Sequence, residues 1–156
     1  MTAKDGGANQ LVDMMNGALE SAIPIAHKMG VKVVEARPGF AATTVPAEGN
    51  GNHFGVIYAG VLFTVAEVLG GLIPLITFDT AKYFPLVKNL DIQFVAMAKS
   101  DVRAEASLDD ETVARIEAEA AERAKADFAL EAVVTDADGQ TVATTRGLYQ
   151  LRAIGK

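Results

Sequence analysis

A single carboxylate interrupts an apolar stretch of the sequence. Residues 56–78 carry one charged side chain, Glu67. Because burial removes water from a carboxylate, we expect the pKa of Glu67 to lie above its usual value of about 4.3. A carboxylate with a raised pKa is suited to act as a general base or a nucleophile near neutral pH. The alternative is that Glu67 reaches solvent, or that a neighbour such as Thr64 satisfies it.

Helical spacing places small and polar residues on the same face as Glu67. Positions three, four and seven residues away hold Thr64, Gly71 and Gly60, whereas the other faces of this helix are apolar. The face therefore gathers most of the polar and small groups of the stretch.

The segment before this helix adds a second feature. Residues 52–55 form a polar loop, and we expect the helix to begin near residues 58–60. The free amide groups of a first helical turn can hold a developing oxyanion on a carbonyl substrate. Small side chains at Ala59 and Gly60 would let such a substrate approach the backbone.

The spacing of these residues resembles that of a known family. Hotdog-fold acyl-CoA thioesterases of the phenylacetate-pathway and hydroxybenzoyl-CoA types carry N-x-x-G-x-x-H-G-G, followed on the helix by an acid. The corresponding positions here are Asn52, Gly55, Tyr58, Ala59 and Gly60, followed by Glu67. The match is closest to an uncharacterised thioesterase-like branch that reads N-H-x-G-x-x-[HY]-A-G-x-L-F-T-x-A-E. Compared with the common motif, Tyr58 replaces a His and Ala59 replaces the first Gly.

The resemblance implies a role for each residue of the motif. Glu67 would be the general base or nucleophile at the thioester carbonyl. The backbone N–H of Ala59, with that of Gly60, would polarise this carbonyl, and Asn52 would orient the attacking water or the substrate. The other implied substrate-binding positions are Gly55, Tyr58, Thr64 and, in place of a hydroxyl residue used by some members, Asn89.

The resemblance also implies a substrate and an assembly. The substrate would be an acyl- or aryl-CoA, so coenzyme A enters as part of the substrate, and neither a metal nor another cofactor is expected. Members of the family are homodimers with two sheets joined edge to edge, or homotetramers. Their active sites lie at the subunit interface, and the Asn and the acid of one site commonly come from different chains.

Three other functions stay open on the sequence alone. Related hotdog dehydratases and hydratases use a His with an acid, which here would be His53 with Glu67. The replacement at Tyr58 is also compatible with a non-catalytic module that binds an acyl-CoA or a lipid. In a purely structural subunit, the small residues around Glu67 would only allow close helix packing.

The composition excludes several classes of function. The chain has 156 residues, 14 Lys and Arg against 20 Asp and Glu, a net charge of −6, two His and no Cys. An acidic chain lacks the basic footprint of a protein that binds nucleic acid or an anionic membrane. Without Cys there is neither thiol catalysis nor a thiolate zinc site. No secretory signal is visible, so we expect a cytoplasmic protein.

Residues 56–78 are long enough to cross a membrane by length and hydropathy. Gly70, Gly71 and Pro74 lie within the stretch, Glu67 is charged, and the flanks lack basic residues. These features favour a buried central helix over residues 56–72, followed by a strand.

The remaining pattern predicts one α+β domain over residues 1–156. We expect an N-terminal helical segment at 1–29, a surface helix at 110–125 and five or six mostly antiparallel strands. The expected strands lie at residues 31–34, 42–46, 90–97, 102–108, 128–135 and 141–151. We expect the strands at 90–97 and 102–108 to pair through a turn at 99–101. With the resemblance above, this is a hotdog fold, a curved antiparallel sheet wrapped around a long central helix.

Overall fold

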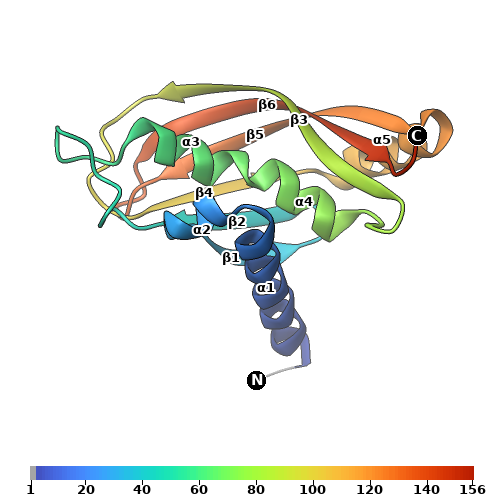
Figure 1. The fold of residues 1–156 in the computed structure, drawn as a ribbon, viewed down its shortest axis with the longest axis horizontal. Coiled ribbons are helices and arrows are strands. Elements are labelled where there is room, and N and C mark those ends of the chain that lie inside the picture. Colours follow the sequence, from blue (N-terminus) through green and yellow to red (C-terminus); the bar gives the residue numbers. More distant parts are fainter. Residues whose placement is uncertain (1–2) are drawn as a thin grey trace.

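In the computed structural model, which describes residues 3–156, a curved sheet wraps around a central helix (Figure 1). The helices are α1 (Ala3–Ala22), α2 (Pro24–Lys28), α3 (Ala59–Glu67), α4 (Leu69–Thr77) and α5 (Asp110–Arg123). The strands are β1 (Lys32–Arg37), β2 (Phe40–Val45), β3 (Tyr83–Phe94), β4 (Val102–Ser107), β5 (Lys125–Thr135) and β6 (Thr141–Ala153). Neighbouring strands are antiparallel, in the order β1-β2-β4-β5-β6-β3. The predicted α+β class, with an antiparallel sheet around a long helix, is confirmed.

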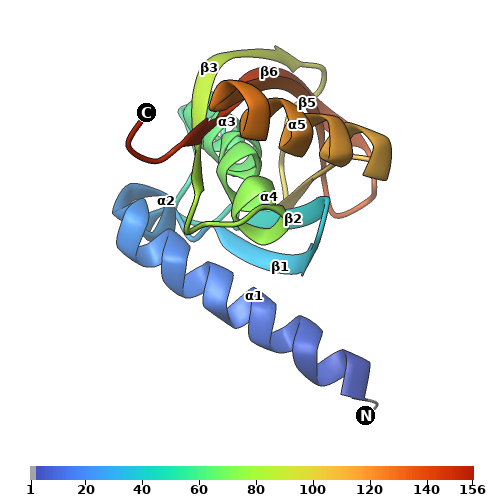
Figure 2. The same cartoon turned by 90° about the vertical axis from the view of Figure 1, so that its right-hand side faces the viewer.

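The two edges of the sheet differ in what covers them. β1 has α1 beside it (Figure 2). Met15 and Leu19 of α1 are buried. β3 forms the other edge, and no segment of residues 3–156 pairs with its outer side. Pro85 lies within β3, which an edge strand tolerates because one side of the strand needs no amide donor. The sheet therefore has one covered edge and one long open edge.

The predicted pairing of residues 90–97 with 102–108 is wrong. β3 pairs with β6, whereas β4 lies between β2 and β5. The reason is in the connection after β3, which does not fold into a tight turn. The carbonyl of Ala98 accepts a hydrogen bond of 2.8 Å from the amide of Ile57, so the connection is held by the loop that enters α3. In place of a hairpin with β4, β3 forms a long antiparallel ladder with β6.

The central helix is longer and less regular than predicted. It runs from Ala59 to Thr77 and is broken at Val68, whereas the sequence analysis placed it at residues 56–72 with a strand directly after it. The next strand begins only at Tyr83. Among the described residues, this helix is the one stretch long and apolar enough to cross a membrane by length and composition, and 56% of its most apolar window is buried inside the fold. It is packed as the core of the sheet.

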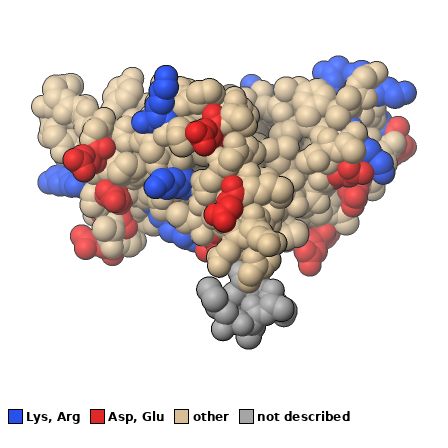
Figure 3. Space-filling view, turned by 60° about the horizontal axis from the view of Figure 1, so that its bottom comes forward, with Lys and Arg blue, Asp and Glu red and all other residues tan. Residues whose placement is uncertain are grey.

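The faces of the sheet carry different side chains. Burial alternates along β5, so that Phe128, Leu130, Ala132 and Val134 face the helix and Ala129, Glu131 and Val133 face outward. The convex face bears three ion pairs. Lys88–Asp127 at 2.8 Å spans β6, Arg103–Glu105 at 3.1 Å lies along β4, and Arg146–Glu131 at 4.0 Å joins neighbouring strands. Figure 3 shows acidic and basic side chains interspersed among uncharged areas on another face of the molecule.

Candidate active site

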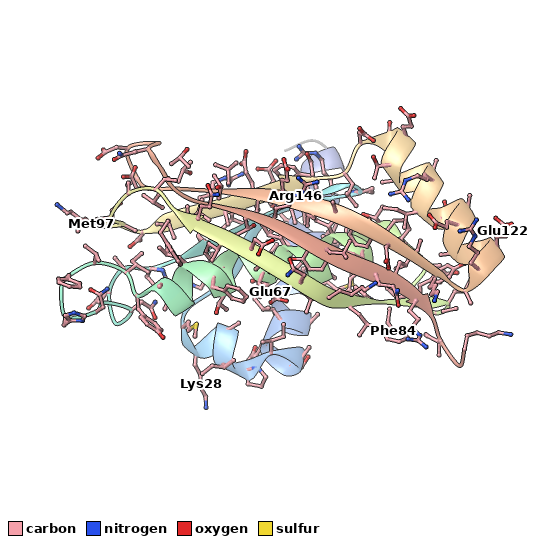
Figure 4. The ribbon with its side chains drawn as sticks, turned by 90° about the horizontal axis from the view of Figure 1, so that it is seen from above. Lys28, Glu67, Phe84, Met97, Glu122 and Arg146 are labelled. Carbon is pink, nitrogen blue, oxygen red and sulfur yellow. The ribbon has the colours of Figure 1, made fainter. Side chains whose placement is uncertain are left out.

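Glu67 is the last residue of α3, at the junction with α4 (Figure 4). Its side chain is about half-buried, and this burial raises the pKa of its carboxyl above the usual value of 4.5. Of the residues that the structure describes, none forms a hydrogen bond or an ion pair with the carboxylate. The hydroxyl of Thr64 donates instead to the carbonyl of Gly60 at 2.8 Å. Glu67 is thus a partly desolvated carboxylate without a partner, which is the state expected of a general base.

The open face of the helix is the one that carries Glu67. Val61, Leu62, Val65 and Ala66 are buried against the sheet. On the other side, Gly60, Thr64, Glu67 and Gly71 are only partly buried, and Phe63 is exposed. The structure therefore brings together the predicted stripe of small and polar residues on an accessible surface.

The start of α3 has two free amide groups. Tyr58 is the N-cap in an extended conformation, with φ −61° and ψ 139°, and its side chain makes no capping bond. The carbonyl of Tyr58 accepts from the amides of Val61 and Leu62. Within residues 3–156 the amides of Ala59 and Gly60 have no acceptor. Two unpaired N–H groups at the positive end of a helix can bind a developing oxyanion.

The ring of Tyr58 lies against Gly60. A Cβ on Gly60 would lie 2.5 Å from Cε1 of the Tyr58 ring, which folds back over the first turn. The ring is otherwise exposed, at 57% of its full accessible area. Tyr58, in the place of the motif His, therefore packs beside the two free amides and leaves its phenol to solvent.

Asn52 shapes the loop before the helix. Its side-chain oxygen accepts from the amides of Phe54 at 2.9 Å and Val56 at 3.4 Å, and its backbone carbonyl accepts from Gly55. Gly55 has φ +73°, a conformation that glycine adopts without strain. The carboxamide oxygen of Asn52 is thus engaged in the loop, so its NH₂ group is the part left to meet a substrate. His53 is exposed in this loop, and its ring lies beside that of Phe54, with centroids 4.0 Å apart and planes tilted by 41°.

One chain does not assemble the whole predicted site. Ala59 and Glu67 are the first and last residues of α3, and a helix of this length rises about 12 Å between them. A single carbonyl carbon cannot contact both the Ala59 amide and the Glu67 carboxylate at that separation. The structure groups Asn52, Gly55 and Tyr58 with the amide end of the helix, and leaves Glu67 at the other end.

Asn89 is not brought to the site. It pairs across the sheet with Leu148, whereas the flanking residues of β6, Gly147 and Tyr149, face the helix. Because directly paired residues share a face, Asn89 lies on the convex side of the sheet. A register shift between Val87 and Asn89 sets this orientation, and a one-residue shift of that kind cannot be read from the sequence.

Tyr149 is a residue near Glu67 that the sequence analysis missed. It is buried on β6, and its hydroxyl donates to the carbonyl of Glu67 at 3.4 Å. Burial first, and then the charge of Glu67, raise the pKa of Tyr149 above its usual value. The signal in the sequence was indirect, because two glycines, Gly70 and Gly147, make room for its ring.

Comparison with known proteins identifies the family. The family model described as "Domain of unknown function (DUF4442)" matches residues 13–149. The chain belongs to the DUF4442 family. A solved structure from Pseudomonas aeruginosa, of a protein of unknown function described as a probable thioesterase, is 40% identical with a TM-score of 0.85. The match covers 90% of this DUF4442 chain and 95% of that chain. No curated protein matches.

More distant solved structures share the fold of this DUF4442 protein. A Chlorobaculum tepidum protein with unknown function is 18% identical, with a TM-score of 0.81 over 93% of this chain and 96% of that chain. A Haemophilus influenzae thioesterase is 15% identical, with a TM-score of 0.73 over 93% of this chain and 92% of that chain. These two matches show the fold alone. The predicted resemblance to the hotdog thioesterase superfamily is confirmed.

Proposed function

We propose that this DUF4442 protein is a thioester hydrolase that acts on an acyl- or aryl-CoA. The observation that carries the proposal is the partly buried, unpartnered carboxylate of Glu67 on the open face of a helix whose first turn offers two free amides. A base and an oxyanion-binding pair are the two groups that hydrolysis of a carbonyl compound needs. The description of the 40% identical relative as a probable thioesterase supports the same reaction.

The reaction uses groups of the chain and one water. Glu67 accepts a proton from the water while the oxygen of this water forms a bond to the thioester carbonyl carbon. The electron pair of the carbonyl moves to its oxygen, which the amides of Ala59 and Gly60 hold. The tetrahedral intermediate collapses, the C–S bond breaks, and the thiolate takes the proton from Glu67. The products are a carboxylic acid and coenzyme A, and the proposed reaction requires no metal or redox cofactor.

The active form in this proposal is a dimer joined at β3. β3 is 12 residues long and its outer edge is open, and several large apolar side chains on or just after it are exposed: Phe84, Leu86, Val87, Phe94, Val95 and Met97. An open apolar edge is the part of a sheet most ready to pair with another strand. A two-fold axis at this edge would set the α3 helices of two copies side by side in opposite directions.

This arrangement supplies what one chain lacks. The amide end of one α3 would face the carboxylate end of the other, so that each site takes Ala59 and Asn52 from one copy and Glu67 from the other. The separation of about 12 Å along α3 is the reason for this assignment. Two dimers could pair further into a tetramer. We place the enzyme in the cytoplasm as part of the same proposal.

The test is the release of free thiol from a panel of acyl- and aryl-CoA esters. We expect the wild type to hydrolyse at least one ester, and Glu67→Gln to lower kcat by about 100-fold or more, because a general base contributes that much. Glu117→Gln, on the exposed side of α5, is the matched control and should keep full activity.

Other outcomes would replace the proposal. Full turnover by Glu67→Gln would remove Glu67 from the reaction. Saturable binding of acyl-CoA without turnover would instead make the chain a binding module, and the absence of binding would make it a structural subunit. Hydration of an enoyl-CoA that is lost in His53→Ala would assign the alternative chemistry to His53 and Glu67.

A further inference from the structure

The helix is irregular at the point where it carries Glu67. α3 ends at Glu67 and α4 begins at Leu69, with Val68 in a turn between them. In a regular helix the amide of Gly71 would bond to the carbonyl of Glu67, but it donates to Val68 at 3.1 Å. The carbonyl of Glu67 accepts instead from the hydroxyl of Tyr149, on β6. A strand residue thus takes the place of a helical bond at this turn.

The ring of Tyr149 fits between two positions that carry no side chain, Gly70 and Gly147. A Cβ on Gly70 would lie 1.8 Å from Cε1 of this ring, and a Cβ on Gly147 would lie 2.3 Å from Cε2. The ring is also stacked on Phe128, with centroids 5.8 Å apart. Tyr149 is therefore closely packed, with its hydroxyl at the break in the helix.

A second buried hydroxyl holds the same turn from another strand. Thr43 of β2 is fully buried, and its hydroxyl donates to the carbonyl of Val65 at 2.7 Å. Thr43 and Tyr149 come from strands that are separated by β4 and β5 in the sheet. The last turn of α3 is therefore tied to the sheet at two points, two residues apart.

We propose that Tyr149 is a positioning residue that sets the place and the environment of the Glu67 carboxylate through the backbone of the helix break. This inference rests on the proposed function of Glu67. The contact of 3.4 Å is long for a hydrogen bond between two oxygens, so its main effect is placement and local polarity. Without the hydroxyl, the backbone carbonyl of Glu67 would lose its hydrogen-bond donor. Its partial negative charge would then act on the nearby carboxylate without compensation.

The electrostatic surroundings make Tyr149 the relevant neighbour. The charged residues of the strands packed on α3 lie on the convex face, where Lys88 pairs with Asp127, Arg103 with Glu35 and Glu105, and Arg146 with Glu131. Asp91 pairs with Arg146 in the sheet register and shares that face. The titratable side chains of the sheet that face the helix are Tyr149 and Tyr83, and Tyr149 is the one that contacts Glu67.

The test is a titration of Glu67 by ¹³C NMR of its carboxyl carbon, assigned by the signal that Glu67→Gln removes. In Tyr149→Phe the ring and its packing stay, and we expect the pKa of Glu67 to rise by about 0.5 units because a donor near the charged form is lost. We also expect kcat to fall about five-fold, with KM within two-fold of the wild type. Tyr83→Phe removes the same atom from another strand and should change neither quantity.

A second variant moves the ring without removing the hydroxyl. Gly147→Ala puts a methyl group against Cε2 of Tyr149, and we expect the pKa of Glu67 to shift in the same direction as in Tyr149→Phe. Tyr149→Phe with a wild-type titration and a wild-type kcat would overturn the inference. A shifted titration in a protein whose wild type hydrolyses no thioester would overturn the proposed function, while it supports the placement of Glu67 by Tyr149.

Discussion

The carboxamide of Asn16 in α1 pairs with both backbone groups of Val33 in β1. Its nitrogen donates to the carbonyl of Val33 at 2.9 Å, and its oxygen accepts from the amide at 2.8 Å. A neighbouring strand would make the same two bonds. One side chain therefore occupies the hydrogen-bonding groups near the start of the β1 edge, next to a bulge in the strand. This leaves β3 as the open edge, in agreement with the proposed dimer.

The Asn16 contact should contribute to stability. Asn16→Leu keeps the approximate volume of the side chain but leaves the amide and the carbonyl of Val33 unpaired, so we expect the free energy of unfolding to fall by about 2 kcal/mol. Urea denaturation followed by circular dichroism measures the change. Asn9→Leu, an exposed position of the same helix, is the control and should stay within about 0.5 kcal/mol of the wild type. Equal stability of the two variants would refute a structural role for the pair.

Two inactive variants should restore activity when mixed. Ala59→Pro removes the amide hydrogen of the first helical residue, and proline is well accepted there because Tyr58 is already extended. We expect Ala59→Pro to lower kcat by about 100-fold or more, as the loss of an oxyanion donor does. A mixture refolded with an equal amount of Glu67→Gln contains mixed dimers with one intact site.

The expected rate of that mixture follows from the symmetry of the dimer. Half of the dimers are mixed and half of their sites are intact, so the rate should reach about one quarter of the wild-type rate. Thiol release before and after refolding measures it. A mixture as inactive as its components would place both groups of a site in one chain.

A charge on the open edge should separate the dimer. Leu86 lies on β3, two residues from Lys88, and Leu86→Lys would add like charge at the proposed interface. We expect the dissociation constant of the dimer to rise about tenfold or more, and the activity per chain to fall with it. Val133→Lys makes the same change on an interior strand at similar exposure. Light scattering after gel filtration measures the mass of each assembly. Equal association of the two variants would count against β3 as the interface.

The stability of the protein should depend on pH through Glu67. Burial raises the pKa of its carboxyl above 4.5, so the folded state holds the proton more tightly than the unfolded state. Stability therefore falls as the pH rises from about 4.5 through the folded pKa, and is constant above it. Glu67→Gln cannot ionise and should lack this decline. Thermal unfolding at pH 4 and pH 8 compares the two proteins, and parallel changes in Tm would contradict the prediction.

The end of α5 should accept glycine with a gain in stability. Ala124 is the C-cap, with φ 62° and ψ 7°, and is the one non-glycine residue with positive φ among those described. This conformation costs a residue with a Cβ about 1 kcal/mol, so Ala124→Gly should raise the free energy of unfolding by up to about that amount. Ala118→Gly, an exposed position within the same helix, should lower it by about 1 kcal/mol. A lower free energy of unfolding in both variants would contradict this prediction.

Local features of the site could be predicted from the sequence. The start of α3 near Tyr58 follows from the change from a polar loop to an apolar run, and the face of Glu67 follows from helical spacing. The hairpin between β5 and β6 follows from the turn at residues 136–139. Each of these depends on residues within a few positions of one another, where the periodicity of the chain carries the information.

Features that depend on distant segments could not be predicted in the same way. The partner of β3 is β6, a strand about 50 residues further along the chain, and the orientation of Asn89 depends on a register shift within this pair. The break at Val68 follows Glu67 in an otherwise apolar run, and no side-chain cap marks it. The role of Tyr149 depends on two glycines that are 77 residues apart in the sequence, 70 and 147. Pattern reasoning treats such glycines as separate turns or helix breakers.

The space around Tyr149 couples the residue types at positions 70, 147 and 149. A methyl group at Gly70 or Gly147 has no room while the ring is present, and a smaller residue at 149 would leave a cavity beneath the helix. A larger residue at position 70 or 147 therefore favours a smaller residue at position 149. Among relatives, the residue at position 149 should therefore change together with the two glycines, and chains that keep all three should keep the carboxylate above them.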